Sequence, residues 1–335
     1  MKMWPAKQTW VSKHANTKAD KLNKNKVKKI TVIKHAALGD LIHVRPMLIT
    51  LRKAFPNAQL TLSVVSNYMQ GIPEDLIDRL HVAKGNDKKY GIKEIYKSFK
   101  ELGHQDIIFD ISATTRSFWV SKLSSAGLKI GFMHKGLHKM LYDIAIPRAH
   151  YRFEAETYLE QVGILGVQYD WPLKYNYPKP ERIHKKPYIV YFPTASVAYK
   201  CWPPENMAKL INEMCSKYPD IDHVLQAGLA DWEIQTADTI ANEITNKDNF
   251  FSYPPGSDAF SLICHANIVV SSDTGMRHLA IAAATPTVCM FPIFTLTFSY
   301  APRFGNHKAV TANESGSIPV SAVSTAINEI SEQVN

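Results

Sequence analysis

Residues 28–65 decide the fold and read "KKITVIKHAALGDLIHVRPMLITLRKAFPNAQLTLSVV". An apolar run at residues 28–36 is followed by a helical spacing of Leu41, Val44, Leu48, Leu51 and Phe55. Residues 58–65 form a second apolar run, so the order is strand, helix, strand, which predicts a βαβ unit in a parallel sheet. Pro46 falls inside the helical pattern, so the helix either starts there or is kinked in its first turns.

The same alternation continues to the end of the chain. Further strands are predicted at "DIIFDIS" (106–112) and "KIGF" (129–132), and a closing helix at 154–165. The pattern restarts with "YIVYF" at residue 188 and runs through "ANIVVSS" (266–272). We therefore predict an α/β fold of two Rossmann-like, doubly wound domains at 27–170 and 188–335. They are joined by a linker at 171–187, which contains four prolines.

The charge of the chain is concentrated in its first 29 residues. They hold nine Lys and one Asp, a net charge of +8, whereas the whole chain carries +9. Since the body of the protein is nearly neutral, the distribution argues against a general nucleic-acid-binding surface. Residues 1–26 have no apolar periodicity, and we expect this basic leader to be disordered.

Several other classes of protein are disfavoured. The four cysteines show no CxxC spacing, so they are expected to be free thiols rather than zinc ligands or disulfides. The first 29 residues lack the apolar core of a secretory signal. Residues 279–298 carry no charge, but prolines interrupt them, and we predict a helix end followed by a buried strand rather than a membrane span.

A Gly-Asp pair, Gly39 and Asp40, ends the first strand segment. In doubly wound folds, ligands bind at the carboxyl ends of the strands, where a carboxylate can reach them. Two interpretations of Asp40 follow: a side chain that faces a ligand site, or a cap of the next helix.

The second half offers two segments suited to a phosphate. In "SSDTGMRHLAIAAA" (271–284) an apolar strand runs into a helix, with Asp273 as the predicted N-cap and Gly275 allowing close approach to the backbone amides. An ordinary capped helix is the alternative for this segment. In "PTASVAYKCWPP" (193–204), Thr194 and Ser196 follow a strand end, and Lys200 could neutralise a leaving diphosphate.

Taken together, four segments resemble the ADP-heptose:lipopolysaccharide heptosyltransferase family. They are "IKHAALGDLIHVRPMLITLRKAFPNAQL", "DIIFDISATTRSFWVSKLSSAGLKIGF", "PTASVAYKCWPPENMAKLI" and "SSDTGMRHLAIAAATPTVCMF". The resemblance covers nearly the whole chain after residue 27. It implies two domains facing across a cleft in the GT-B arrangement. The implied activity is inverting transfer of heptose from ADP-heptose to a lipopolysaccharide inner-core acceptor, with no metal ion or other cofactor.

Carried over position by position, the resemblance makes Asp40 the catalytic base. It places the donor at Thr194, Ser196, Lys200, Asp273, Thr274, Gly275 and His278. Inner-core acceptors are anionic, and four cations of the first half are candidate contacts: Arg116, Lys122, Lys135 and Arg148. Because Asp40 and Asp273 lie far apart in sequence, the reaction is expected to require closure of the two domains.

The chain departs from the family in two places. Where the family continues with a Phe-Gly-Pro-Thr-like loop, this chain has "MFPIFTLTF" (290–298), so the same fold with another nucleotide-sugar donor is an alternative. The basic leader is longer than the pattern needs. We hypothesise that it holds a cytoplasmic enzyme against anionic lipid of the inner membrane. A non-catalytic binder of nucleotides or anionic polymers is the alternative from another class.

Overall fold

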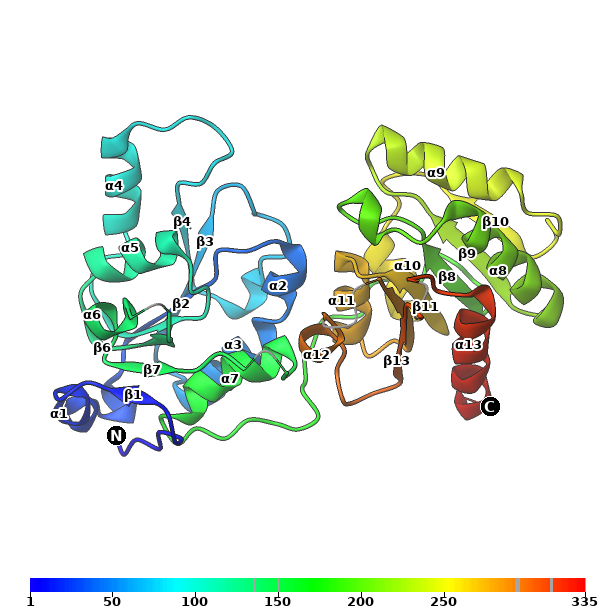
Figure 1. Ribbon diagram of the computed structural model, residues 1–335. Helices are drawn as coiled ribbons and strands as arrows, with labels where there is room; N and C mark the ends of the chain where they lie inside the picture. Colours follow the sequence, from blue (N-terminus) through cyan, green and yellow to red (C-terminus); the bar gives the residue numbers. More distant parts are fainter. Residues whose placement is uncertain (135, 150, 293–295, 314–315, 335) are drawn as a thin grey trace. The chain divides into compact units, whose positions relative to one another are not determined.

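The computed structural model describes residues 1–134, 136–149, 151–292, 296–313 and 316–334. The chain divides into two compact units, unit 1 at 1–174 and unit 2 at 175–335 (Figure 1). The division falls inside the segment 171–187 that was predicted to link two domains. This segment contains no helix or strand, although Leu173 and Tyr175 within it are buried.

Unit 1 contains a seven-stranded sheet in the order β1-β7-β6-β5-β2-β3-β4, parallel except where β1 meets β7. Its strands are β1 Trp10–Val11, β2 Lys29–Ile33, β3 Gln59–Val65, β4 Arg79–Ala83, β5 Gln105–Asp110, β6 Ala126–Phe132 and β7 Ile144–Ile146. Ile30 to Ile33 are all buried, as expected for a central strand covered on both faces.

Helices cover both faces of this sheet (Figure 1). They are α1 Ala15–Lys21, α2 Leu38–Ile42, α3 Arg45–Ala54, α4 Ile92–Lys100, α5 Thr115–Leu123, α6 His138–Leu141 and α7 Glu154–Gly163, with short 3-10 turns at Lys24–Lys26 and Glu74–Leu76. Pro46 lies in the first turn of α3, where its missing N–H has no intrahelical partner to lose, and the helix starts one residue before it, at Arg45. The preceding turn forms the separate helix α2.

The basic leader is folded, so the prediction of disorder was wrong. Strand β1 pairs antiparallel with β7, and α1 buries Ala15 and Ala19 completely. Lys18 forms an ion pair with Asp143 at 2.7 Å. The prediction rested on the high lysine content of the whole segment. A few small and aromatic side chains within it are enough to pack against the edge of the sheet, and the average composition does not show them.

Unit 2 contains a parallel six-stranded sheet in the order β10-β9-β8-β11-β12-β13. Its strands are β8 Tyr188–Phe192, β9 Asp222–Gln226, β10 Phe250–Tyr253, β11 Ile268–Ser272, β12 Thr287–Phe291 and β13 His307–Thr311. Its helices are α8 Pro204–Lys217, α9 Asp231–Asn242, α10 Ala259–His265, α11 Gly275–Ala282, α12 Leu296–Tyr300 and α13 Val320–Val334, with a 3-10 turn at Ala198–Lys200. One core cluster includes residues of α8 and α13, and a second includes residues of α10 and α11.

The uncharged stretch at 279–298 comprises the end of α11, the fully buried strand β12 and the start of α12. This confirms the predicted helix end followed by a buried strand. In the part of the chain that the structure describes, no helix combines the length and apolar character needed to cross a membrane.

Each sheet has one point where the strand order reverses. In unit 1 the chain runs outward from β2 to β3 and β4 and then returns to β5 on the other side of β2. In unit 2 the same happens between β8 and β11. Loops diverge at such a switch point and leave a crevice at the carboxyl ends of the strands, where ligands of doubly wound folds bind.

Candidate active site

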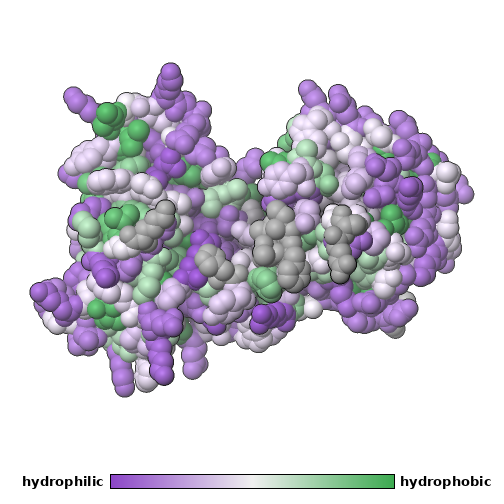
Figure 2. All heavy atoms as spheres, viewed as in Figure 1, coloured by the Kyte–Doolittle hydropathy of each residue, from purple (hydrophilic) through white to green (hydrophobic). Residues whose placement is uncertain are grey.

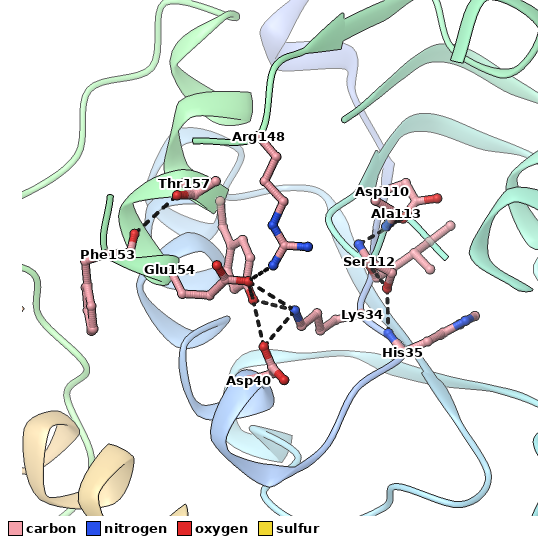
Figure 3. Close-up of polar contacts among 12 residues, drawn as sticks. Lys34, His35, Asp40, Asp110, Ser112, Ala113, Arg148, Phe153, Glu154 and Thr157 are labelled. Atoms are coloured by element: carbon pink, nitrogen blue, oxygen red, sulfur yellow. Dashed lines mark hydrogen bonds and ion pairs between the residues drawn. The ribbon is translucent and has the colours of Figure 1, made fainter. Parts of the chain in front are cut away.

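Asp40 lies in the first turn of α2, directly beyond the carboxyl end of β2 and at the switch point of unit 1. Ala37 occupies the N-cap position of this helix and makes no side-chain bond. The carboxylate of Asp40 instead accepts a hydrogen bond from Lys34 Nζ at 3.1 Å (Figure 3) and lies 3.4 Å from Tyr158 Oη. Its position is therefore not explained by capping of the helix.

A buried network of polar side chains contacts the Asp40 carboxylate. Lys34 directly follows β2, and its side chain is 3% exposed. It contacts Glu154 of α7 at 3.7 Å and also donates a hydrogen bond to Tyr158. Tyr158 donates to Glu154 Oε1 at 2.7 Å, and Arg148 pairs with the same oxygen. Figure 3 shows the four charged side chains of this network pointing toward one another, from the residue after β2, from α2, from α7 and from the segment before α7.

The electrostatics of the network keep Asp40 ionised. Burial acts to raise the pKa of the Asp40 carboxyl, but the adjacent Lys34 ammonium, with smaller contributions from His43 and Arg148, outweighs it and lowers that pKa. Burial, with the negative charges of Glu154 and Asp40, raises the pKa of Tyr158 well above its ordinary value. Because the Asp40 side chain remains 26% exposed, it is a charged carboxylate that a ligand can reach from solvent.

The other predicted acceptor contacts have different surroundings. Arg148 belongs to the network around Asp40. Arg116, in the first turn of α5, donates to Asn86 Oδ1 at 3.0 Å. Lys122, farther along α5, is exposed beside an apolar groove. Lys135 lies outside the described residues.

Unit 2 has a pocket of about 430 Å³ at its own switch point. The segments that follow β8, β9 and β11 line it, together with residues 256–259. Thr194, Ser196 and Thr274, three of the predicted donor residues, line the pocket. Glu233 of α9 also lines it and accepts a hydrogen bond from Thr194 Oγ1 at 3.0 Å.

A charged trio lies next to the start of α11. The buried Asp273 accepts from Lys200 Nζ at 2.9 Å and from Arg277 at 3.3 Å, so the trio carries a net charge of +1. The prediction of Asp273 as the N-cap was wrong, because these two cations occupy its carboxylate. Thr274 is the N-cap, and its side chain accepts from the Met276 amide.

The remaining predicted donor residues belong to the same helix. Gly275 is the first residue of α11, and the buried His278 packs edge-on against Tyr300, with ring centroids 5.5 Å apart. Lys200, Arg277 and the amides of the first helical turn together supply positive potential. The arrangement suits a diphosphate beside the pocket. The segment "MFPIFTLTF" (290–298), where this chain differs from the family pattern, includes residues 293–295, which lie outside the described residues.

Five residues of the two sites were missed in the sequence: Lys34, Glu154, Tyr158, Glu233 and Arg277. Lys34 had a signal, because a charged side chain ends a strand that is otherwise apolar. Arg277 lies within the segment 271–284 that was singled out. Glu154, Tyr158 and Glu233 had none, since they become site residues only through contacts with distant segments.

Groups of three or more His, Cys, Asp or Glu side chains that could hold a metal ion are absent from the described part of the chain. The four cysteines are free thiols, as expected.

Comparison with known proteins gives concordant matches. A family model for glycosyltransferase family 9 (heptosyltransferase) matches residues 95–299. Lipopolysaccharide heptosyltransferase 3 of Escherichia coli K12 is 22% identical over 276 residues, 76% of this chain and 79% of that protein. The structure of E. coli heptosyltransferase WaaC with ADP has a TM-score of 0.73 and 22% identity, covering 90% of this chain and 99% of its own. WaaC with ADP-2-deoxy-2-fluoro heptose gives 0.72 and 21%, covering 92% and 100%.

Proposed function

The chain belongs to glycosyltransferase family 9, and on that premise we propose that it transfers heptose from ADP-heptose to a lipopolysaccharide inner-core acceptor, with inversion and without a metal ion. The family and the doubly wound fold that the four sequence motifs predicted are thereby confirmed, as is glycosyl transfer as the type of reaction. The donor, the acceptor and the roles of individual residues are the proposal. The family model begins after Asp40, so the role of this residue rests on its surroundings.

The observation that carries the proposal is the ionised, solvent-accessible carboxylate of Asp40 at the switch point of unit 1. A sugar hydroxyl is a weak nucleophile until its proton is removed. Asp40 takes that proton while the hydroxyl oxygen attacks the anomeric carbon, and general-base help of this kind contributes about 10²–10⁴-fold.

The donor half of the proposal rests on unit 2. When the bond to the anomeric carbon breaks, negative charge develops on the departing diphosphate. Lys200 and the amino end of α11 supply the opposite charge, with Thr274 and Gly275 amides and His278 beside the phosphates. Thr194, Ser196 and Glu233 line the adjacent pocket, and the Glu233 carboxylate is a natural acceptor for the hydroxyls of a ribose. The similarity to WaaC, solved with ADP, agrees with an adenine nucleotide.

The acceptor half rests on cations of unit 1. Arg148, beside Asp40, and Arg116 of α5 are proposed to contact anionic groups of the acceptor. Because such an acceptor is a glycolipid, we further propose that the enzyme works at the cytoplasmic face of the inner membrane.

Asp40→Asn tests the central assignment. The amide keeps the size of the side chain but cannot take up a proton, so turnover should fall about 10²–10⁴-fold while folding and ADP affinity stay near those of the unaltered chain. Asp170→Asn is the control, because Asp170 forms an exposed ion pair with Lys53 in the same unit. Unaltered turnover in Asp40→Asn would refute the base assignment.

The donor base is tested by thermal shift with ADP, UDP and GDP. A ligand that binds only the folded state raises its stability according to concentration and affinity. ADP should raise the melting temperature most. A preference for UDP would contradict an ADP-heptose donor and favour the alternative of another nucleotide sugar.

A further inference from the structure

An apolar groove lies between α5 and α6 of unit 1. Thr115, Phe118, Trp119 and Lys122 form one stripe of α5 at helical spacing, and Leu137, Met140 and Leu141 face it across a space of about 310 Å³. Trp119 is 54% exposed, Leu137 45% and Met140 70%. Figure 2 shows apolar side chains reaching the surface of unit 1 among hydrophilic ones in this region. Such a concentration of large exposed apolar side chains on a soluble surface marks an interaction site.

The basic leader is folded against the same region. Trp10 of β1 lies edge-on to His138 of α6, with ring centroids 5.7 Å apart. Trp10 and Leu141 also pack against the buried cluster that contains Phe118, which lines the groove. The leader is therefore attached beside the groove.

Exposed lysines lie on the elements that form this apolar surface and on the leader beside it. Lys122 lines the groove, and Lys139 is exposed on α6 between Leu137 and Met140. Lys7 and Lys13 are exposed in the leader, three residues before and after Trp10. Large apolar side chains on elements that also carry lysines match the boundary between acyl chains and anionic headgroups of a bilayer.

We propose that the α5–α6 groove and the folded leader form one docking face for an anionic membrane surface. Trp119, Leu137 and Met140 enter the boundary between headgroups and acyl chains, and the lysines contact lipid phosphates. The choice of a membrane rests on the proposed function, because a glycolipid acceptor is presented at such a surface. Pairing with a second copy through this face would bring together two leaders of like charge, which repel each other.

The test measures co-sedimentation with vesicles of phosphatidylglycerol and phosphatidylcholine, and with vesicles of phosphatidylcholine alone. Trp119→Ser combined with Met140→Ser should weaken binding to the mixed vesicles by more than about tenfold. Lys122→Gln and Lys139→Gln should each weaken it about fivefold, and only where the anionic lipid is present. Trp232→Ser is the matched control, because Trp232 is an exposed tryptophan, 40% exposed, on α9 of unit 2. It should leave binding unchanged.

Insertion is checked separately from adhesion. Vesicles with brominated acyl chains should quench the fluorescence of the unaltered chain more than that of Trp119→Phe, since bromine quenches only a tryptophan that reaches the acyl region. Circular dichroism and melting temperature verify that the groove variants are folded. If the groove variants bind mixed vesicles as well as the unaltered chain, or if no Trp119-dependent quenching is seen, the proposal is overturned.

Activity assays separate this inference from the proposed function. The variant that combines Trp119→Ser with Met140→Ser should turn over a deacylated, water-soluble acceptor at the normal rate and lose activity only with acceptor embedded in vesicles. A chain that transfers no heptose but binds vesicles through the groove would overturn the function and support the docking face. Sedimentation velocity tests whether the groove instead binds a second copy of the chain. If the unaltered chain is a dimer and Trp119→Ser is a monomer, the groove is a dimer interface and the membrane proposal is overturned.

Discussion

Lys34→Met removes the one ammonium that Asp40 contacts in the buried network. Methionine preserves most of the length and apolar stem of lysine but carries no charge. The Lys34 ammonium is the largest cause that lowers the pKa of Asp40. When it is removed, burial still acts to raise that pKa. An opposite charge at this distance lowers a carboxyl pKa, so the pKa of Asp40 should rise when that charge is removed.

The assay is the dependence of kcat/KM on pH. General-base catalysis requires the ionised carboxylate, so the acid limb of the profile should move to higher pH. At alkaline pH, where Asp40 is ionised in both proteins, the remaining difference reports only lost positioning of the carboxylate. An acid limb at the same pH in Lys34→Met and the unaltered chain would refute the tuning of Asp40 by Lys34.

The same substitution should reduce stability. Removing one partner of a buried ion pair costs about 3–5 kcal/mol, and the lower figure applies because Arg148 and Tyr158 still contact Glu154. For a unit of this size about 3 kcal/mol lowers the melting temperature by about 6–12 °C. Lys53→Met is the control: it removes a Lys–Asp pair of 2.7 Å whose side chains are 62% and 46% exposed, and the melting temperature should not change.

Three further predictions concern donor binding and acid stability. Lys200→Ala, which removes the partner of Asp273, should weaken ADP binding by about 10–100-fold in calorimetry; unchanged affinity would remove Lys200 from the diphosphate site. Glu233→Gln, beside Thr194, should weaken ADP binding about tenfold but leave 2′,3′-dideoxy-ADP unaffected; equal losses for both would argue against a ribose contact. Burial lowers the pKa of His35 to about 3, so the unfolded chain takes up its proton first as pH falls below 6.5. This one imidazole should therefore account for about 2 kcal/mol of the stability lost from pH 7 to pH 5, and His35→Gln should reduce the slope in urea denaturation by that share; an unchanged slope would contradict it.

Central strands could be predicted from the sequence because they are buried on both faces. β2, β8 and β11 are mostly apolar, and a proline near the start of α3 and α8 marks where each helix begins. Edge strands carry much weaker signals. β1 has two residues, β7 has three, and β13 has no fully buried residue, so none of them stands out from a loop.

The site residues also divide into those that a local sequence motif predicts and those that it does not. Asp40, Lys200 and Asp273 belong to short local motifs at strand ends, and the sequence alone placed them there. Tyr158 reaches Asp40 across 118 positions, and Glu233 reaches Thr194 across 39. These contacts depend on the order of the strands in the sheet, which brings distant segments together. No local sequence pattern predicts them.

The pairing of β1 with β7 makes the leader part of the sheet. Removing residues 2–26 would strip away basic charge, but it would also uncover the backbone of Ile144 and Ala145 and the contacts made by α1. A bare strand edge of this kind invites pairing with another chain and aggregation. Truncation would then mimic a loss of lipid affinity for a reason unrelated to electrostatics. Charge at this end of the protein is better altered one lysine at a time, with the strand left in place.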